Sequence, residues 1–131
     1  MAKIKAILVE PYQRARIVNI EHTLENFQDI VGGLIQALYP WEDQVAIIAD
    51  DEGKLKHSPM NRLLEDEDGE PYDFIAGTFL IVGLTETDFG SLSDDIAEKY
   101  LKKFKEPEEF IRFPNGRVFR FKKGARPKCI A

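Results

Sequence analysis

The stretch that decides the fold is Phe74-Ile75-Ala76-Gly77-Thr78-Phe79-Leu80-Ile81-Val82-Gly83, which lies within the longest apolar run of the chain. A short run that is apolar at nearly every position predicts an inner strand, buried on both faces of a sheet. This run is far below the roughly 20 residues that a membrane-spanning helix needs. Gln44 to Asp50, with the core Val45-Ala46-Ile47-Ile48-Ala49, predicts a second inner strand by the same argument.

The remaining elements are predicted by working outward from these two strands. Further strands are expected at Ala2 to Glu10, Arg14 to Ile20 and Leu34 to Tyr39, and a C-terminal hairpin at Phe110 to Phe113 with Arg117 to Lys122. One helix is expected between the cap Thr23 and the stop Gly32-Gly33, and a second over Asp94 to Phe104 after the cap Ser93. Strands in runs, with few helices between them, predict an α+β fold with a mainly antiparallel sheet.

Length and charge indicate one domain with a distinct C-terminal end. The 131 residues fit a single domain, which we assign to residues 1–123, followed by a basic and flexible tail over residues 124–131. Net charge is −5, but residues 1–100 carry 20 Asp/Glu against 8 Lys/Arg, whereas residues 101–131 carry 10 Lys/Arg against 3 Asp/Glu. The basic end either neutralises the acidic body or binds an acidic partner.

Sequence patterns disfavour catalysis, metal binding and export. The two histidines, His22 and His57, have no convincing partner nearby in the sequence for a base or nucleophile pair. Calcium-loop and phosphate-loop motifs are incomplete or absent, so we expect no metal and no cofactor. The single cysteine, Cys129, cannot form an internal disulfide, and no signal peptide is evident. We therefore expect a non-catalytic protein of a reducing cytoplasm.

A polar loop is predicted between the two inner strands. Asp51-Glu52-Gly53 predicts a turn in which Gly53 has a positive φ. His57 to Leu64 predicts an irregular loop or a single helical turn that presents Asn61 and Arg62. Two interpretations of Arg62 stay open. It pairs with Glu65 or Asp66 in its acidic surroundings, or it is desolvated and reaches a phosphate or carboxylate.

The C-terminal hairpin alternates aromatic and basic residues. Its aromatic residues are Phe110, Phe113, Phe119 and Phe121, and its basic residues are Arg112, Arg117 and Arg120. Such a pattern either places phenylalanines in the core and arginines in solvent, or forms a surface for single-stranded nucleic acid.

Several short motifs together resemble a known family. They are Glu10-Pro11, Thr23-Leu24-Glu25, Val31-Gly32-Gly33, Asp51-Glu52-Gly53-Lys54-Leu55, Pro59-Met60-Asn61-Arg62, Asp73-x-Ile75-x-Gly77-Thr78-Phe79, Ser91-Leu92-Ser93-Asp94 and Lys99-Tyr100. On these motifs, about Ile4 to Phe113 resembles domain-of-unknown-function family 3846, small proteins carried by phages and conjugative elements of bacteria. The resemblance implies an accessory protein of a mobile element and does not imply an enzyme.

Three functions remain as hypotheses, each with its own surface. A counter-defence protein could sequester a nucleotide-type signal, within one chain or between subunits of a homo-oligomer, in a pocket made by Asn61, Arg62, Tyr72, Thr78 and Arg112. Alternatively, the acidic face of residues 42–52 and 65–70 could cover a basic groove on a host defence protein or nuclease. A third alternative is nucleic-acid binding through the basic hairpin and tail, with an affinity that falls steeply with salt.

Overall fold

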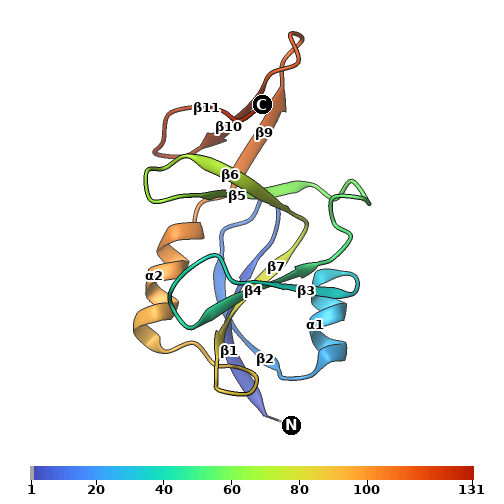
Figure 1. Cartoon of the computed structure of the whole chain (residues 1–131), viewed down its shortest axis with the longest axis vertical. Coiled ribbons are helices and arrows are strands. Elements are labelled where there is room, and N and C mark those ends of the chain that lie inside the picture. Colours follow the sequence, from blue (N-terminus) through green and yellow to red (C-terminus); the bar gives the residue numbers. More distant parts are fainter. Residues whose placement is uncertain (1) are drawn as a thin grey trace.

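The computed structural model describes residues 2–131, and Figure 1 shows its elements along the chain. The strands within these residues are β1 (Lys3–Val9), β2 (Arg16–Glu21), β3 (Ile35–Leu38), β4 (Val45–Asp50), β5 (Met60–Glu65), β6 (Pro71–Ala76), β7 (Phe79–Leu84), β8 (Phe89–Gly90), β9 (Glu108–Arg112), β10 (Val118–Lys122) and β11 (Lys128–Cys129). The helices are α1 (Leu24–Val31) and α2 (Asp94–Phe104). The predicted α+β class is confirmed.

The main sheet carries the core on both of its faces. Its strand order is β2-β1-β7-β4-β3, with β8 added beside β7, and every pairing is antiparallel. In β4, Ile47 packs with the residues under α2, whereas the next residue, Ile48, packs with those under α1. A strand whose successive side chains are all buried must be covered from both sides. The predictions of inner strands at β4 and β7 are therefore confirmed.

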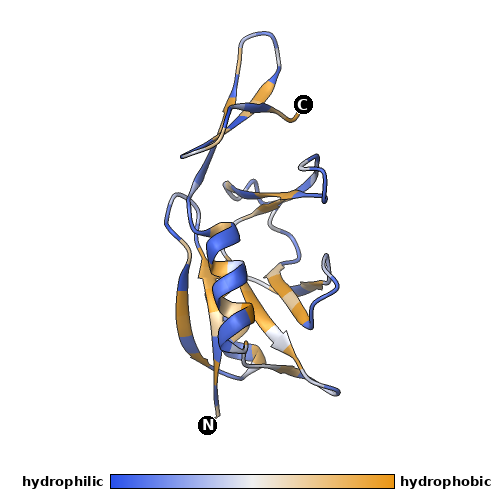
Figure 2. Ribbon diagram, turned by 90° about the vertical axis from the view of Figure 1, so that its left-hand side faces the viewer, coloured by the Kyte–Doolittle hydropathy of each residue, from blue (hydrophilic) through white to orange (hydrophobic). Residues whose placement is uncertain are grey.

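The two helices begin and end where the sequence predicts. The Thr23 side chain accepts a hydrogen bond from the Asn26 amide, and Gly32 ends α1 with φ 87° in the left-handed region. Ser93 caps α2 by accepting from the Ile96 amide. Figure 2 shows the strands of the main sheet as largely hydrophobic and the outer side of α2 as hydrophilic, as expected for a helix that covers one face of a sheet.

The predicted strand from Phe74 to Gly83 is wrong as a single element. The chain turns at Gly77, whose φ is 81°, so that β6 pairs with β5 in a two-stranded ribbon and β7 enters the main sheet. The Gly77 amide donates to the Pro59 carbonyl (2.8 Å), which holds the turn against the start of β5. A left-handed glycine within an apolar run therefore divides the run between two sheets.

The predicted loop or helical turn from His57 to Leu64 is also wrong from Met60 onward, because Met60–Glu65 forms β5. The register with β6 shifts between Met60 and Arg62, so Asn61 is an extra residue without its own partner on β6. A bulge of this kind bends the strand and redirects side chains. As a result, Asn61, Arg62, Leu63 and Leu64 are all buried in succession, which strict alternation would forbid.

Gly53 is required for close packing and not, as predicted, for a positive φ. Its φ lies outside the left-handed region, but a Cβ atom placed on it would lie 2.7 Å from the Ala76 carbonyl oxygen. We expect Gly53→Ala to lower the free energy of unfolding by about 1–3 kcal/mol, because backbone atoms must move to relieve the overlap. Urea unfolding followed by Trp41 fluorescence measures this, with the exposed neighbour Glu52→Ala as control. Equal stability of both variants would contradict the close contact.

The C-terminal residues form a third sheet, ordered β11-β10-β9, which extends from the end of the molecule in Figure 1. The predicted hairpin across Pro114-Asn115-Gly116 is confirmed as β9 and β10. Part of the basic segment 124–131, predicted to be a tail, supplies β11, which pairs with β10 through Phe119 and Arg120. Among residues 2–131, neither helix has the length and apolar character needed to cross a membrane.

Candidate functional site

Arg62 lies at the centre of a buried polar cluster. Its side chain is 0% exposed, and its guanidinium donates to backbone carbonyls of two distant segments. Nε and Nη2 donate to the Phe104 carbonyl (3.1 and 3.0 Å), and Nη2 also donates to the Gln13 carbonyl (2.8 Å). Nη1 donates to the carbonyl and to Oδ1 of Asn61 (3.2 and 2.8 Å). All five N–H donors of the guanidinium are thereby used.

Asn61 extends the same cluster to two more segments. Its Nδ2 donates to the carbonyl of Val9 at the end of β1 (2.9 Å) and to the carbonyl of Gly77 at the β6–β7 turn (2.8 Å). Together, Asn61 and Arg62 join β1, the β1–β2 turn, the β6–β7 turn and the last residue of α2. The Phe104 carbonyl lies at the negative end of the α2 dipole, where a cation is stabilised.

The predicted pairing of Arg62 with Glu65 or Asp66 is therefore wrong, whereas its contact with a ligand phosphate or carboxylate stays a prediction that this geometry disfavours. The guanidinium forms no ion pair with Glu65 or Asp66, and it has no N–H left for a ligand phosphate. Burial lowers the pKa of Arg62, although the charges of Glu108 and Glu106 raise it, and the net shift is downward. Because arginine starts from a very high pKa, it stays charged in this site.

The other residues of the predicted pocket lie apart from this cluster. Tyr72 projects from β6 and is 57% exposed, and Thr78 is half-buried in the β6–β7 turn. Arg112 is exposed at the end of β9, where its Nη1 donates to the Gly116 carbonyl of the hairpin turn (3.3 Å). Of the five predicted residues, Tyr72 is the one that reaches a large surface cavity.

That cavity, which we call the acidic groove, has a volume of about 670 Å³. Three segments far apart in the sequence line it: the β3–β4 loop, the β5–β6 turn and one side of α2, which lie along the same side of the molecule in Figure 1. The lining residues are Pro40, Trp41, Glu42, Asp43, Glu65, Asp66, Glu67, Asp68, Tyr72, Lys99, Tyr100 and Lys103. Six carboxylates thus face two lysines.

One wall of the acidic groove is held rigidly. Asp43 accepts hydrogen bonds from Lys99 Nζ (2.6 Å) and from the Tyr100 hydroxyl (2.7 Å), and Trp41 packs on the Tyr100 ring with centroids 4.5 Å apart. The bond from Lys99 and then that from Tyr100 lower the pKa of Asp43. Burial, followed by the bond to Asp43, raises the pKa of the Tyr100 hydroxyl. Asp43 is therefore occupied by the protein itself.

Other carboxylates of the acidic groove are free of lysine and arginine, whereas Glu65 is paired with Arg120 and Lys128. Within residues 2–131, Glu42, Glu67 and Asp68 form no salt bridge, and Asp66 accepts backbone amides of its own turn from Asp68 and Glu70 (2.9 Å each). Burial, Asp73 and Asp66 raise the pKa of Tyr72, so its hydroxyl stays protonated at neutral pH. The acidic groove thus combines unpaired negative charge with an exposed aromatic ring.

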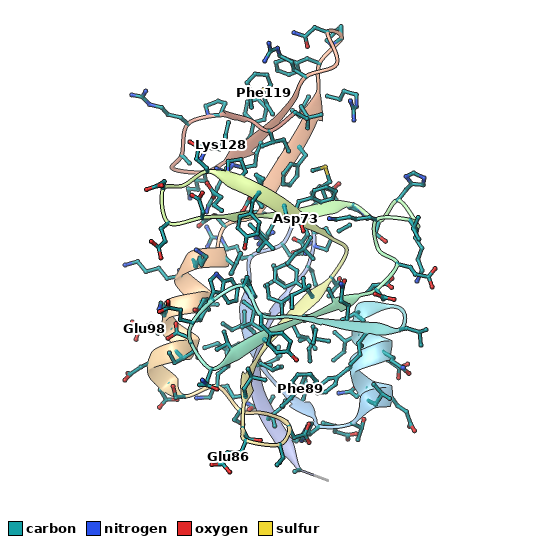
Figure 3. The ribbon with its side chains drawn as sticks, in the orientation of Figure 1. Asp73, Glu86, Phe89, Glu98, Phe119 and Lys128 are labelled. Atoms are coloured by element: carbon teal, nitrogen blue, oxygen red, sulfur yellow. The ribbon has the colours of Figure 1, made fainter. Side chains whose placement is uncertain are left out.

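Arg120 of the hairpin is buried, which corrects the expectation that the hairpin arginines face solvent or nucleic acid. Its Nη1 pairs with Glu108 Oε1 (3.0 Å) and Glu65 Oε1 (3.4 Å), and Glu108 also accepts the Leu63 amide (3.1 Å). Lys128 pairs with Glu65 Oε2 (3.0 Å), and Figure 3 places Lys128 where the C-terminal sheet meets the β5–β6 ribbon. These ion pairs attach the C-terminal sheet to β5.

The histidines and acidic residues form no metal-binding cluster in the described part of the chain. No group of three or more His, Cys, Asp or Glu side chains in residues 2–131 is arranged to hold a metal ion. His22 Nε2 lies 3.2 Å from Asp88 Oδ2 at the surface, and His57 has a φ of 57° in the β4–β5 connection.

Comparison with known proteins identifies the family. No curated protein and no solved structure matches the chain. The family model described as "Domain of unknown function (DUF3846)" matches residues 4–105, which span the main sheet, both helices and the β5–β6 ribbon. The C-terminal sheet lies beyond the matched residues. The chain therefore belongs to the DUF3846 family, to which no function is assigned.

Proposed function

We propose that this protein is a non-catalytic binding protein that holds a lysine- or arginine-bearing segment of a partner protein in the acidic groove. The observation that carries the proposal is the set of unpaired carboxylates, Glu42, Glu67 and Asp68, at the rim of a cavity of about 670 Å³. Clefts lined by one sign of charge attract ligands of the opposite sign and speed their association.

The aromatic residues of the acidic groove suit the same partner. Tyr72 is exposed and Trp41 is half-buried, so both can present part of a ring to a guanidinium or ammonium group. A cation over an aromatic face gains about 0.5–1 kcal/mol at an exposed site. A phosphate-bearing ligand would instead be repelled here, and Arg62 cannot receive it elsewhere. The acidic-face hypothesis is therefore better supported than nucleotide sequestration.

The expected origin of the family gives the partner a context. Because the resemblance implies proteins of phages and conjugative elements, we place this protein in the cytoplasm of a bacterial host and its partner among host proteins. Covering a basic surface of a host defence protein is the counter-defence role that the acidic groove supports. Residues 50–52, predicted to belong to the same acidic face, do not line this groove, so the contact centres on the β3–β4 loop and the β5–β6 turn.

A charge-matched comparison tests the acidic groove directly. The probe is a fluorescein-labelled peptide of eight alternating lysine and arginine residues, titrated by anisotropy at 50 and 150 mM NaCl. We expect the triple variant Glu42→Gln, Glu67→Gln, Asp68→Asn to bind the peptide about tenfold more weakly, since each lost rim charge costs a few tenths of a kcal/mol or more.

The control removes the same charge from elsewhere on the surface. The control is a triple variant with the same change in net charge at three exposed positions outside the groove, Glu21→Gln, Glu25→Gln and Glu86→Gln. We expect its affinity for the peptide to stay within about twofold of that of the wild type. If both triple variants lose affinity equally, net charge and not the acidic groove attracts the peptide. Failure of the wild type to bind at 50 mM NaCl would also contradict the proposal.

A further inference from the structure

The C-terminal sheet has an inner and an outer face, set by the register of its strands. Glu108 and Arg120 point inward to β5, where both are buried. Ile111 lies opposite Phe119, and Phe121 lies opposite Glu109, so these four alternate with the inward residues and face the other way. We call the side that carries Ile111, Phe119 and Phe121 the outer face.

The outer face exposes apolar and aromatic side chains. Ile111 is 43% exposed and Phe113 is 38% exposed. Phe113 stacks on Phe119 with ring centroids 5.0 Å apart and planes 28° apart, which leaves a phenyl surface at the end of the hairpin. Figure 3 shows Phe119 in this part of the molecule, away from the main sheet. A hydrophobic cluster held at the surface in this way indicates an interaction site.

A hollow continues the outer face toward the β1–β2 turn. It has a volume of about 650 Å³ and is lined by Ile111, Phe121 and Tyr12, and Tyr12 is 62% exposed. Tyr12 has a φ of 66°, an uncommon conformation for a residue other than glycine, which directs this ring into solvent. Aromatic rings are thus available at both ends of the outer face.

Most cations of the C-terminal sheet are not neutralised by the protein, and two of them, Arg117 and Lys123, follow the same alternation as Phe119 and Phe121. Five basic residues of this sheet form no salt bridge within residues 2–131: Arg112, Arg117, Lys122, Lys123 and Arg126. The other two basic residues beyond Pro107, Arg120 and Lys128, are paired with Glu108 and Glu65 on the inner side. Glu109 also lies on the outer face, and Glu106 is paired with Arg14 beside the hollow. Unpaired positive charge exceeds unpaired negative charge.

We propose that the outer face binds single-stranded nucleic acid without sequence preference. Phe113 and Tyr12 would stack on bases, while Arg117 and Lys123 would contact phosphates. Stacking on an exposed ring requires an unstacked base, which a single strand offers and a duplex does not. The excess of unpaired cations on this sheet favours a polyanion over an apolar peptide. This site is separate from the acidic groove, so either proposal can fail alone.

Fluorescence anisotropy of a labelled twelve-residue oligo(dT), titrated with the full chain between 25 and 200 mM NaCl, tests the proposal. For single strands, the logarithm of the binding constant falls with the logarithm of salt by about 0.7 per phosphate contact. We expect a slope of about −2 to −3, corresponding to three or four of the five cations. A parallel titration with oligo(rU) shows whether RNA is preferred over DNA.

Two variants separate stacking from charge. Phe113→Ser is expected to weaken binding by about fivefold or more, because the loss of one stacked base costs about 1–3 kcal/mol, without changing the salt slope. Arg117→Ala with Lys123→Ala is expected to reduce the slope by about 1.4. The matched control, Lys3→Ala with Lys102→Ala, removes two exposed charges elsewhere and is expected to leave the slope unchanged.

Three results would overturn the proposal. They are an absence of binding at 25 mM NaCl, equal or tighter binding of a twelve-base-pair duplex, and a control double variant that loses as much slope as Arg117→Ala with Lys123→Ala. A sedimentation mass that doubles with concentration for the wild type but not for Phe113→Ser would assign the outer face to contact between two copies of the chain instead.

Discussion

Arg62→Met is expected to lower the free energy of unfolding by about 3–5 kcal/mol, because four acceptors lose their donor and an unsatisfied buried polar group costs about 1–3 kcal/mol. The acceptors are the carbonyls of Phe104, Gln13 and Asn61 and Oδ1 of Asn61. Methionine fills most of the volume of the aliphatic part of the arginine side chain. The loss of unfolding free energy therefore measures mainly the lost hydrogen bonds. Urea unfolding followed by the fluorescence of Trp41 measures it.

Two further variants make this experiment decisive. Arg62→Lys keeps the charge but cannot reproduce the planar guanidinium fork, so we expect it to recover less than half of the loss. Arg112→Met removes an exposed arginine that donates only to the Gly116 carbonyl, and its effect is expected to stay within about 0.5 kcal/mol. A loss of 3–5 kcal/mol is a large fraction of the 5–15 kcal/mol of stability typical of a domain. If Arg62→Met does not fold, Arg62→Lys still gives a folded state whose stability can be measured.

The Arg62 variants also distinguish a structural from a ligand-binding role. If Arg62→Met unfolds at the same urea concentration as the wild type, the five hydrogen bonds of the guanidinium contribute nothing to stability. If, in addition, a nucleotide is released by denaturing the wild type and not by denaturing Arg62→Met, the ligand pocket predicted from the sequence would be restored. We expect the opposite result on both measurements.

The parts of the fold that sequence predicts are those determined by local chemistry. The cap Thr23, the stop at Gly32 and the cap Ser93 each act within one helical turn, so their positions follow from nearby residues. The inner strand β4 follows from apolar side chains at consecutive positions, and the C-terminal hairpin from the turn residues around Gly116. None of these requires knowledge of a distant segment.

The errors arise where distant backbone decides the local structure. Asn61 and Arg62 are polar neighbours and so predict a loop, but carbonyls from Val9 and Phe104 satisfy their side chains inside the core. Nothing local shows that those acceptors are present. In the same way, Gly77 is compatible with a continuous strand until the β5–β6 ribbon requires a left-handed residue at that point.

The sequence predicts the charge of the acidic groove but not its shape. The acidic segments at Glu42 and at Glu65 to Asp68 are evident in the sequence, and their charge predicts an acidic face. Their convergence with Lys99 and Tyr100 of α2 depends on the packing of the helix against the β3–β4 loop, which no local pattern records. The sequence predicts Tyr72 as a functional residue for a different reason, as a ring that stacks on a nucleotide beside Arg62.

Arg120→Met is expected to release the C-terminal sheet from β5 and to cost about 3–5 kcal/mol of docking free energy. The variant leaves the carboxylate of Glu108, whose side chain is 3% exposed, without its partner, and an unpaired buried charge is strongly destabilising. The Leu63 amide alone cannot replace the guanidinium. Amide hydrogen exchange is the measurement, because β9 and β10 should lose protection while β4 and β7 retain it.

A second substitution identifies the charge as the cause. Glu108→Gln keeps an oxygen for the Leu63 amide but removes the negative charge, so the double variant Glu108→Gln with Arg120→Met is expected to recover most of the lost protection. Replacement of a whole buried ion pair by neutral groups is often tolerated, whereas removal of one partner is not. The control Arg117→Met changes an exposed arginine just before β10 and is expected to leave exchange unchanged.

Acid should weaken the same attachment in the wild type. Burial raises the pKa of Glu65, but the bond from Lys128 and the charge of Arg120 outweigh burial, so the pKa lies below its ordinary value. A carboxylate whose pKa is lowered by docking stabilises the docked state fully when the pH is above its ordinary pKa. This stabilisation is lost as the pH falls through the lowered pKa. Protection of β9 and β10 should therefore decrease below about pH 4.5 in the wild type and depend less on pH in Arg120→Met. Full protection of β9 and β10 in Arg120→Met at neutral pH would show that apolar contacts alone hold the C-terminal sheet.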